Sequence, residues 1–236
     1  RAQETDLGLQ GEERADQASL ASLARLLMHR NPDVRDLAGE LRRDLSLDGV
    51  RAIQVDLDYV YDEDPAQLER NVDALVQRMQ DIGPSHVWLQ AFADPDGDGA
   101  AEAVYFPSRH MPVRADLFNR VAWQLRTRAQ VRVYAWMPVL GFKLADAELQ
   151  RELQIVATGE NEIPRLDPGD PRTLAIVSDI YAELAANSHF DGLLFHDDAY
   201  LRDDEIPAYG GGVPAARTQG LIDFTMALKT AAQRWR

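Results

Sequence analysis

Residues 50–92 read VRAIQVDLDYVYDEDPAQLERNVDALVQRMQDIGPSHVWLQAF and contain a strand, a helix and a second strand, in that order. The first stretch, residues 50–60, alternates β-branched or apolar side chains with polar ones, which is typical of a strand. Residues 64–82 carry apolar side chains at three- and four-residue spacing, which predicts an amphipathic helix that ends at Gly83-Pro84. Residues 86–92, HVWLQAF, are predicted to form the second strand. This order predicts two parallel strands joined by a helical crossover.

The alternation of strands and helices continues along the chain, around a polar insertion at 143–168. Further helices are expected at 114–129, 170–187 and 218–235, and further strands at 131–140 and 191–197. Four strands alternating with four helices predict an α/β fold with a parallel sheet. The sheet is either a small open one or part of a (βα)₈ barrel, a fold that takes about 250 residues for eight units. As a barrel, the chain carries only the first four βα units.

Residues 1–48 differ from the remainder of the chain. After a polar start, two segments with helical spacing, the second opened by Asn31-Pro32, predict an N-terminal helical segment. We therefore expect two parts: a helical segment over 1–48, and a (βα)-barrel domain over 49–236 whose C-terminal part lies outside this sequence.

Composition narrows the classes of partner. The chain has 236 residues, with 25 Lys and Arg against 39 Asp and Glu, so its formal charge is −14. This balance argues against nucleic acid and against anionic lipid as partners, and fits a cationic or neutral one. The absence of cysteine excludes disulfides, thiolate metal sites and a cysteine nucleophile.

Polar and aromatic residues gather where the four predicted strands end, which is where parallel α/β folds place their chemistry. They are Asp56, Asp58, Tyr59, Gln90, Phe92, Trp136, His196, Asp197, Asp198 and Tyr200. Carboxylates beside aromatic faces are typical of carbohydrate sites, because rings stack on sugars and carboxylates perform acid and base chemistry. An acidic pair after a strand also serves as a loop cap in many proteins. We take Asp197 as the catalytic acid, with Asp198 as the alternative, and the other eight as substrate-binding residues.

Two further patterns bear on the chemistry. Asp56 and Asp58 are two residues apart and are expected to share one face of a strand. Residues 94–99, DPDGDG, resemble the first half of a calcium-binding loop, but the twelfth position is Tyr105 where that motif needs Glu. We therefore expect a rigid turn that shapes the cleft, and no metal. With no phosphate loop, dinucleotide fingerprint or zinc pair in the sequence, we predict no cofactor.

Several of these stretches together resemble the C-terminal glycoside hydrolase domain of PgaB-type proteins, the poly-β-1,6-N-acetylglucosamine deacetylase/hydrolases of biofilm systems. They are VDLDYVYDEDPAQLERNVDALVQRM, VWLQAFADPDGDG, FNRVAWQLRTR, VYAWMPVL and FDGLLFHDDAYLRDDE, in the order of that family, and the resemblance covers residues 51–236. It implies a (βα)₈-like barrel that continues past residue 236, including at least one further active-site acidic residue. The deacetylase domain of the family would lie upstream, so deacetylation is not expected from this chain.

The resemblance also implies an activity, a partner and a location. The activity is endo-hydrolysis of partially deacetylated poly-β-1,6-N-acetylglucosamine, whose ammonium groups suit an acidic protein. The location is the periplasm, with outer-membrane association through a segment not in this chain, and an export-machinery protein is the expected partner besides the polymer. The alternative is a non-catalytic polysaccharide-binding module that guides the polymer during export with the same acidic and aromatic residues.

Overall fold

The computed structural model describes residues 50–155, 163–202, 213 and 215–235. The chain divides after Arg51, and almost all described residues belong to the second unit. The expected helical segment over 1–48 lies outside the described residues. Among the described helices, none combines the length and the apolar composition needed to cross a bilayer.

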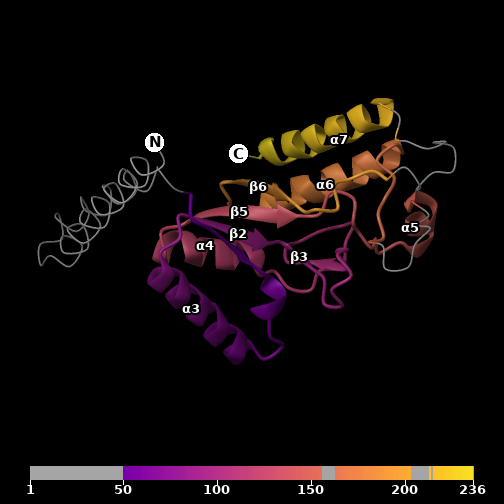
Figure 1. The fold of residues 1–236 in the computed structure, drawn as a ribbon. Helices are drawn as coiled ribbons and strands as arrows, with labels where there is room; N and C mark the ends of the chain where they lie inside the picture. The colour runs from indigo at the N-terminus through magenta and orange to yellow at the C-terminus, as the bar shows by residue number, and fades with distance from the viewer. Residues whose placement is uncertain (1–49, 156–162, 203–212, 214, 236) are drawn as a thin grey trace, which may run out of the picture. The chain divides into compact units, whose positions relative to one another are not determined.

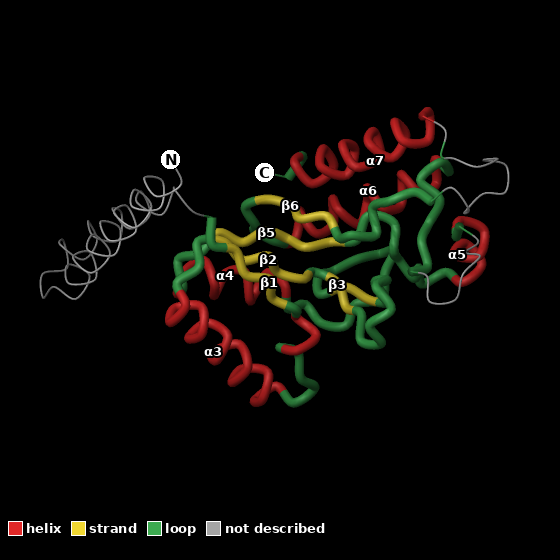
Figure 2. Tube along the Cα trace, viewed as in Figure 1, coloured by secondary structure: helices red, strands yellow, loops and turns green. Residues whose placement is uncertain are grey.

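A four-stranded parallel sheet forms the centre of the described unit (Figures 1 and 2). Its strands are β1 (Ala52–Val55), β2 (His86–Gln90), β5 (Arg132–Met137) and β6 (Gly192–Phe195), and their order in the sheet is their order in the chain. The register pairs Ala52 with His86, and Trp136 with both Gln90 and Leu194. The prediction of an α/β fold with a parallel sheet is thereby confirmed.

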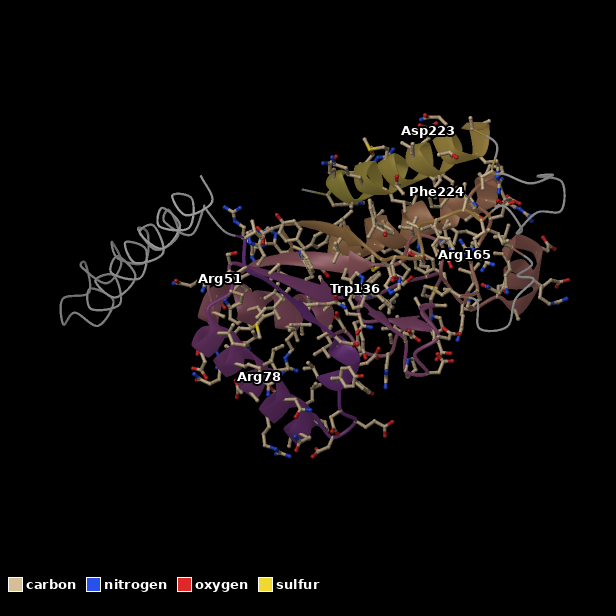
Figure 3. The ribbon with its side chains drawn as sticks, in the orientation of Figure 1. Arg51, Arg78, Trp136, Arg165, Asp223 and Phe224 are labelled. Atoms are coloured by element: carbon tan, nitrogen blue, oxygen red, sulfur yellow. The ribbon has the colours of Figure 1, made fainter. Side chains whose placement is uncertain are left out.

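Four long helices follow the four strands: α3 (Pro65–Ile82), α4 (Phe118–Arg128), α6 (Pro171–Asn187) and α7 (Ala215–Gln233). Asp64 caps α3 by accepting the Ala66 N–H, and Gly83 ends the same helix in the left-handed conformation, with φ 63°. α6 and α7 lie side by side (Figure 1). Phe224 is buried on the α6 side of α7, and Asp223 points away from it (Figure 3).

The two faces of the sheet differ in burial. On one face, Val87, Leu89, Val133, Ala135 and Met137 are completely buried in the core beneath the helices. On the other face, Trp88, Tyr134 and Trp136 remain partly exposed within the described residues. Right-handed crossovers between strands in sequential order place every helix on the same side, as in a barrel, whereas a doubly wound open sheet is covered on both sides. The four units therefore have the arrangement of the first half of a (βα)₈ barrel.

Local structure departs from the sequence prediction at two strand ends. β1 stops at Val55, and Leu57–Tyr59 form a short 3₁₀ helix (η2), because Asp56 accepts the Asp58 N–H and closes a turn. The expectation that Asp56 and Asp58 share a strand face is therefore wrong.

The segment predicted as one strand over 86–92 is two strands. The Ala91 N–H donates to the Trp136 carbonyl at the end of β2, and the chain then turns into β3 (Phe92–Ala93), which pairs antiparallel with β4 (Ala103–Val104). The polar insertion also contains a short helix that sequence analysis did not predict, α5 (Ala147–Leu153), capped by Asp146.

Candidate active site

A pocket of about 610 Å³ opens where the parallel strands end. Its lining comes from three strands, from the segment that follows β6, from the β3–β4 connection and from the connection between α5 and α6: Gln54, Asp94, Gly97, Asp98, Gly99, Trp136, Ile163, Leu194, Phe195, His196 and Asp197. Trp136 lies next to the last residue of β5 (Figure 3). An acidic and aromatic lining at the carboxyl ends of parallel strands is the arrangement expected for an α/β active site.

Trp136 and His196 form the aromatic side of the pocket, and the ring of Phe92 packs behind them. Trp136 stacks on His196 with ring centroids 5.2 Å apart and an interplanar angle of 15°. The buried ring of Phe92 packs in a T-shaped arrangement against Trp136 and His196, with ring centroids 5.3 and 5.6 Å away, respectively. The indole is therefore held in place from behind by packed rings, and a fixed aromatic surface suits stacking against a sugar.

The adjacent carboxylates Asp197 and Asp198 have opposite environments. The side chain of Asp197 is 90% exposed and lines the pocket. Asp198 is completely buried and accepts hydrogen bonds from the N–H groups of Val139, Leu140 and Gly141 at 2.5 to 3.1 Å. Burial raises the pKa of Asp198, and the three N–H groups oppose that rise by favouring the charged form. Of the two, only Asp197 is in position to reach a ligand in this pocket.

His196 connects the aromatic rings with the carboxylates. Its Nδ1 lies 2.8 Å from Asp197 Oδ1 and 3.8 Å from Asp198 Oδ1. The 2.8 Å contact lies outside hydrogen-bond geometry, so Nδ1 is buried without a hydrogen-bond partner among the described residues. The imidazole therefore packs against the candidate acid.

Asp58 lies behind the pocket at the centre of a hydrogen-bond network. Its Oδ2 accepts from Gln90 Nε2 at 3.1 Å and from the Asp94 N–H at 2.9 Å. Its Oδ1 accepts from the Tyr105 hydroxyl at 2.6 Å and from Arg114 at 2.5 Å. Burial and the bond to Asp58 raise the pKa of Tyr105 well above its usual value, so the phenol remains a donor. The network joins the ends of β1 and β2 to the β3–β4 ribbon.

The first part of the connection between β3 and β4 is a turn over residues 94–99, and the side chain of its first residue holds this turn together. Asp94 Oδ1 accepts the N–H groups of Gly97 and Asp98, and Oδ2 accepts that of Gly99. Gly97 and Gly99 have φ angles of 73° and 87°, which glycine adopts without strain. Burial raises the pKa of Asp94, partly offset by the Gly99 N–H.

Carboxylate oxygens of Asp94, Asp96 and Asp98 lie within 4.8 Å of one another, as in a cation site. A lysine ammonium already approaches this group, because Lys143 Nζ lies 3.1 Å from Asp96, 2.8 Å from Asp98 and 2.6 Å from Glu102. Burial lowers the pKa of Lys143, but its hydrogen bonds to Asp98, Glu102 and Asp96 together raise it above its usual value. Lys143 thus supplies one positive charge beside this group of carboxylates, and Asp94 is not among its ion-pair partners in the described part of the chain.

The structure distributes the predicted site residues over three places. Trp136, His196 and Asp197 line the pocket. A second group supports it without lining it: Asp56, Asp58, Gln90, Phe92 and Asp198. Tyr59 and Tyr200 belong to neither group, although the Tyr200 N–H donates to the Asp198 carbonyl.

The two tyrosines occupy different surroundings. Tyr59 is 87% exposed, on η2, outside the pocket lining. The ring of Tyr200 receives the guanidinium of Arg165, 3.9 Å from the ring centroid. Their predicted contact with substrate stays a prediction.

Sequence analysis missed other lining residues, among them Gln54, Asp94, Asp98 and Leu194. Gln54 was recognisable from the sequence, because it is the polar residue inside an otherwise apolar strand. In the structure it lies on the same side of β1 as the partly exposed face of the sheet. Asp94 and Asp98 were recognised only as parts of a turn that shapes the cleft.

Comparison with known proteins gives consistent matches. A family model described as hypothetical glycosyl hydrolase family 13 matches residues 54–235. The chain is 46% identical over 198 residues to the poly-β-1,6-N-acetyl-D-glucosamine N-deacetylase of Escherichia coli strain K12; the match covers 81% of this chain and 29% of that enzyme. The chain thus spans less than a third of this curated relative.

Solved structures with the same fold include the PgaB (BpsB) glycoside hydrolase domain from Bordetella bronchiseptica, with 45% identity and a TM-score of 0.69 over 78% of this chain and 61% of that one. A hypothetical protein from Ruminiclostridium thermocellum, 11% identical with a TM-score of 0.51 over 75% of this chain and 91% of that one, shares the fold alone. The chain therefore belongs to the family described as hypothetical glycosyl hydrolase family 13, as a glycoside hydrolase domain related to that of PgaB.

Proposed function

We propose that this domain is an endo-acting hydrolase of partially deacetylated poly-β-1,6-N-acetylglucosamine and that Asp197 is its general acid. The observation that carries the proposal is the position of Asp197, an exposed carboxylate at a strand end that lines a pocket together with Trp136. An acid and an aromatic surface in one cleft are what glycosidic bond cleavage needs.

The choice of polymer rests on similarity and on charge. The E. coli relative is named for poly-β-1,6-N-acetyl-D-glucosamine, and 46% identity makes a related polysaccharide the first candidate. Deacetylated units carry ammonium groups. The pocket lining contains three carboxylates, Asp94, Asp98 and Asp197, on a chain with a net charge of −14. Such a pocket attracts a polymer with ammonium groups more strongly than a neutral one.

In the proposed reaction, Asp197 donates a proton to the glycosidic oxygen as the bond from that oxygen to the anomeric carbon breaks. Positive charge then develops at the anomeric carbon, and either a second carboxylate or the N-acetyl oxygen of the substrate stabilises it. Addition of water and loss of a proton complete the hydrolysis. Trp136 holds the sugar ring against the pocket, and His196 restricts where the Asp197 carboxylate lies.

The test is incubation of the protein with partially deacetylated polymer, followed by measurement of new reducing ends and of polymer length. We expect shortened chains from the native protein. The Asp197→Asn variant should lose cleavage by at least about a hundredfold and keep its affinity for the polymer, because general acid catalysis contributes about 10²–10⁴-fold.

Asp223→Asn is the matched control, because Asp223 is an exposed aspartate on α7 away from the pocket. It should cleave like the native protein. Cleavage by Asp197→Asn at the native rate would remove Asp197 from the mechanism. Binding of polymer by the native protein without shortening would instead support a non-catalytic polysaccharide-binding module.

The proposal also includes a cellular location and a second partner for the domain. We place the domain in the periplasm, in contact with the polymer during export, with an export-machinery protein as a second partner. Fractionation of cells that produce the full natural protein tests this, and recovery in the cytoplasmic fraction would contradict it.

A further inference from the structure

Asp58 has no free acceptor position for a substrate. A carboxylate offers about four lone-pair positions. Those of Asp58 accept four donors from four different segments: Gln90, the Asp94 N–H, Tyr105 and Arg114. Its side chain is only 13% exposed. A sugar hydroxyl or ammonium group would have to displace one of these donors before it reached Asp58.

The hydrogen bond from the Asp94 N–H connects Asp58 to the lining of the pocket. The Asp94 N–H that it accepts belongs to the residue that starts the 94–99 turn, and the Asp94 carboxylate then accepts the N–H groups of Gly97, Asp98 and Gly99. The two carboxylates act in series, since Asp58 fixes the backbone of Asp94, and Asp94 fixes the remainder of the turn. Four residues of that turn line the pocket: Asp94, Gly97, Asp98 and Gly99.

The two donors to Asp58 Oδ1, Tyr105 and Arg114, are also held in place. Tyr105 is completely buried, and its backbone N–H donates to the Ala91 carbonyl. The Arg114 guanidinium stacks over the Tyr61 ring, 4.6 Å from its centroid. Asp58 therefore lies between a rigid support and the turn that forms the acidic side of the pocket.

We propose that Asp58 is a positioning residue that fixes the 94–99 turn, so that Asp94 and Asp98 face a cationic sugar unit in the pocket. The inference rests on the proposed function for the nature of the ligand. Removal of the Asp58 carboxylate loosens the turn and weakens substrate binding, while proton donation by Asp197 continues.

The kinetic test compares Asp58→Asn with Tyr105→Phe on partially deacetylated polymer. The second variant leaves the Asp58 carboxylate intact and removes only one of its supports. We expect KM to rise about tenfold in Asp58→Asn and about threefold in Tyr105→Phe, with kcat within about twofold of native in both. Because both changes act through one network, the double variant should have a KM no higher than that of Asp58→Asn alone.

The matched control is Asp167→Asn. Asp167 also accepts a backbone N–H, from Gly169, and pairs with Arg217 at 2.7 Å, but it does not line the pocket. Its KM should equal that of the native protein. If Asp58 contacts substrate directly, Asp58→Asn raises KM and Tyr105→Phe leaves it unchanged, and this result would overturn the proposal. A kcat loss in Asp58→Asn comparable to that of Asp197→Asn would also overturn it.

A second readout does not depend on activity. Amide hydrogen exchange at Gly97, Asp98 and Gly99 should be at least about tenfold faster in Asp58→Asn and in Tyr105→Phe than in the native protein and Asp167→Asn. Unchanged exchange would refute the positioning role even if KM rose. If the native protein neither binds nor cleaves the polymer, the proposed function fails, and the exchange measurement still decides whether Asp58 fixes the turn. Should Asp58→Asn fail to fold, Tyr105→Phe alone supplies both readouts.

Discussion

At the scale of single residues, Asp197 and Asp198 differ by burial. One is exposed in the pocket, and the other is buried against three consecutive backbone N–H groups. The sequence predicted that the pair ends a strand at the working edge of the sheet. It left open which aspartate faces the groove, because that depends on the path of residues 139–141, which are more than fifty positions away in the chain.

The buried carboxylate should matter mainly for stability. Asp198→Asn keeps the shape but turns an N–H₂ group toward a backbone donor, so we expect the free energy of unfolding to fall by about 1–3 kcal/mol. Asp198→Ala should cost more, because it leaves all three N–H groups unsatisfied. Urea unfolding at neutral pH measures both. If Asp198→Asn has native stability but no hydrolase activity, Asp198 and not Asp197 is the better candidate for the acid.

At the scale of elements, local signals predicted the ends of α3 and α6 well, but they placed the start of α4 four residues early and that of α7 three residues late, and they predicted strand ends poorly. Asp64-Pro65 and Gly83 mark the two ends of α3, because capping and the left-handed turn depend on neighbouring residues alone. The split of 86–92 into β2 and β3 depends on the Trp136 carbonyl, which accepts the Ala91 N–H from another strand. The pocket residues Gln54 and Leu194 were missed for the same reason, since sheet register brings them to one face.

Two glycines should respond to alanine with opposite signs. Gly83→Ala places a side chain at φ 63° and should lower the free energy of unfolding by about 1 kcal/mol. Gly220 lies inside α7 with open space around its Cβ position, so Gly220→Ala should raise it by about 0.5–1 kcal/mol through helix propensity. Chemical denaturation of the two variants measures both changes in the free energy of unfolding. Changes of the same sign would contradict this account of the two glycines.

At the scale of the whole molecule, the main property is the net charge of −14. Attraction between an acidic protein and a cationic polymer is screened within about 8 Å at physiological salt. The exposed ion pairs of the surface contribute little to stability, so salt should act mainly on binding.

We expect the affinity for partially deacetylated polymer to fall at least about tenfold between about 50 mM and about 500 mM salt. Affinity for fully acetylated oligomers, which carry no ammonium groups, should change by less than about twofold. Titration calorimetry with the two ligands measures the contrast. Equal salt dependence would show that charge does not select the substrate.

The order of the strands has a consequence for how the domain forms. Since β1, β2, β5 and β6 are neighbours in the sheet in the same order as in the chain, each strand finds its partner in the unit made just before it. Among these four strands, none is inserted between two that precede it in the chain. The pocket needs Gln54 from the first strand and Leu194 from the fourth. The binding site of this domain is therefore complete only when all four of these strands have paired.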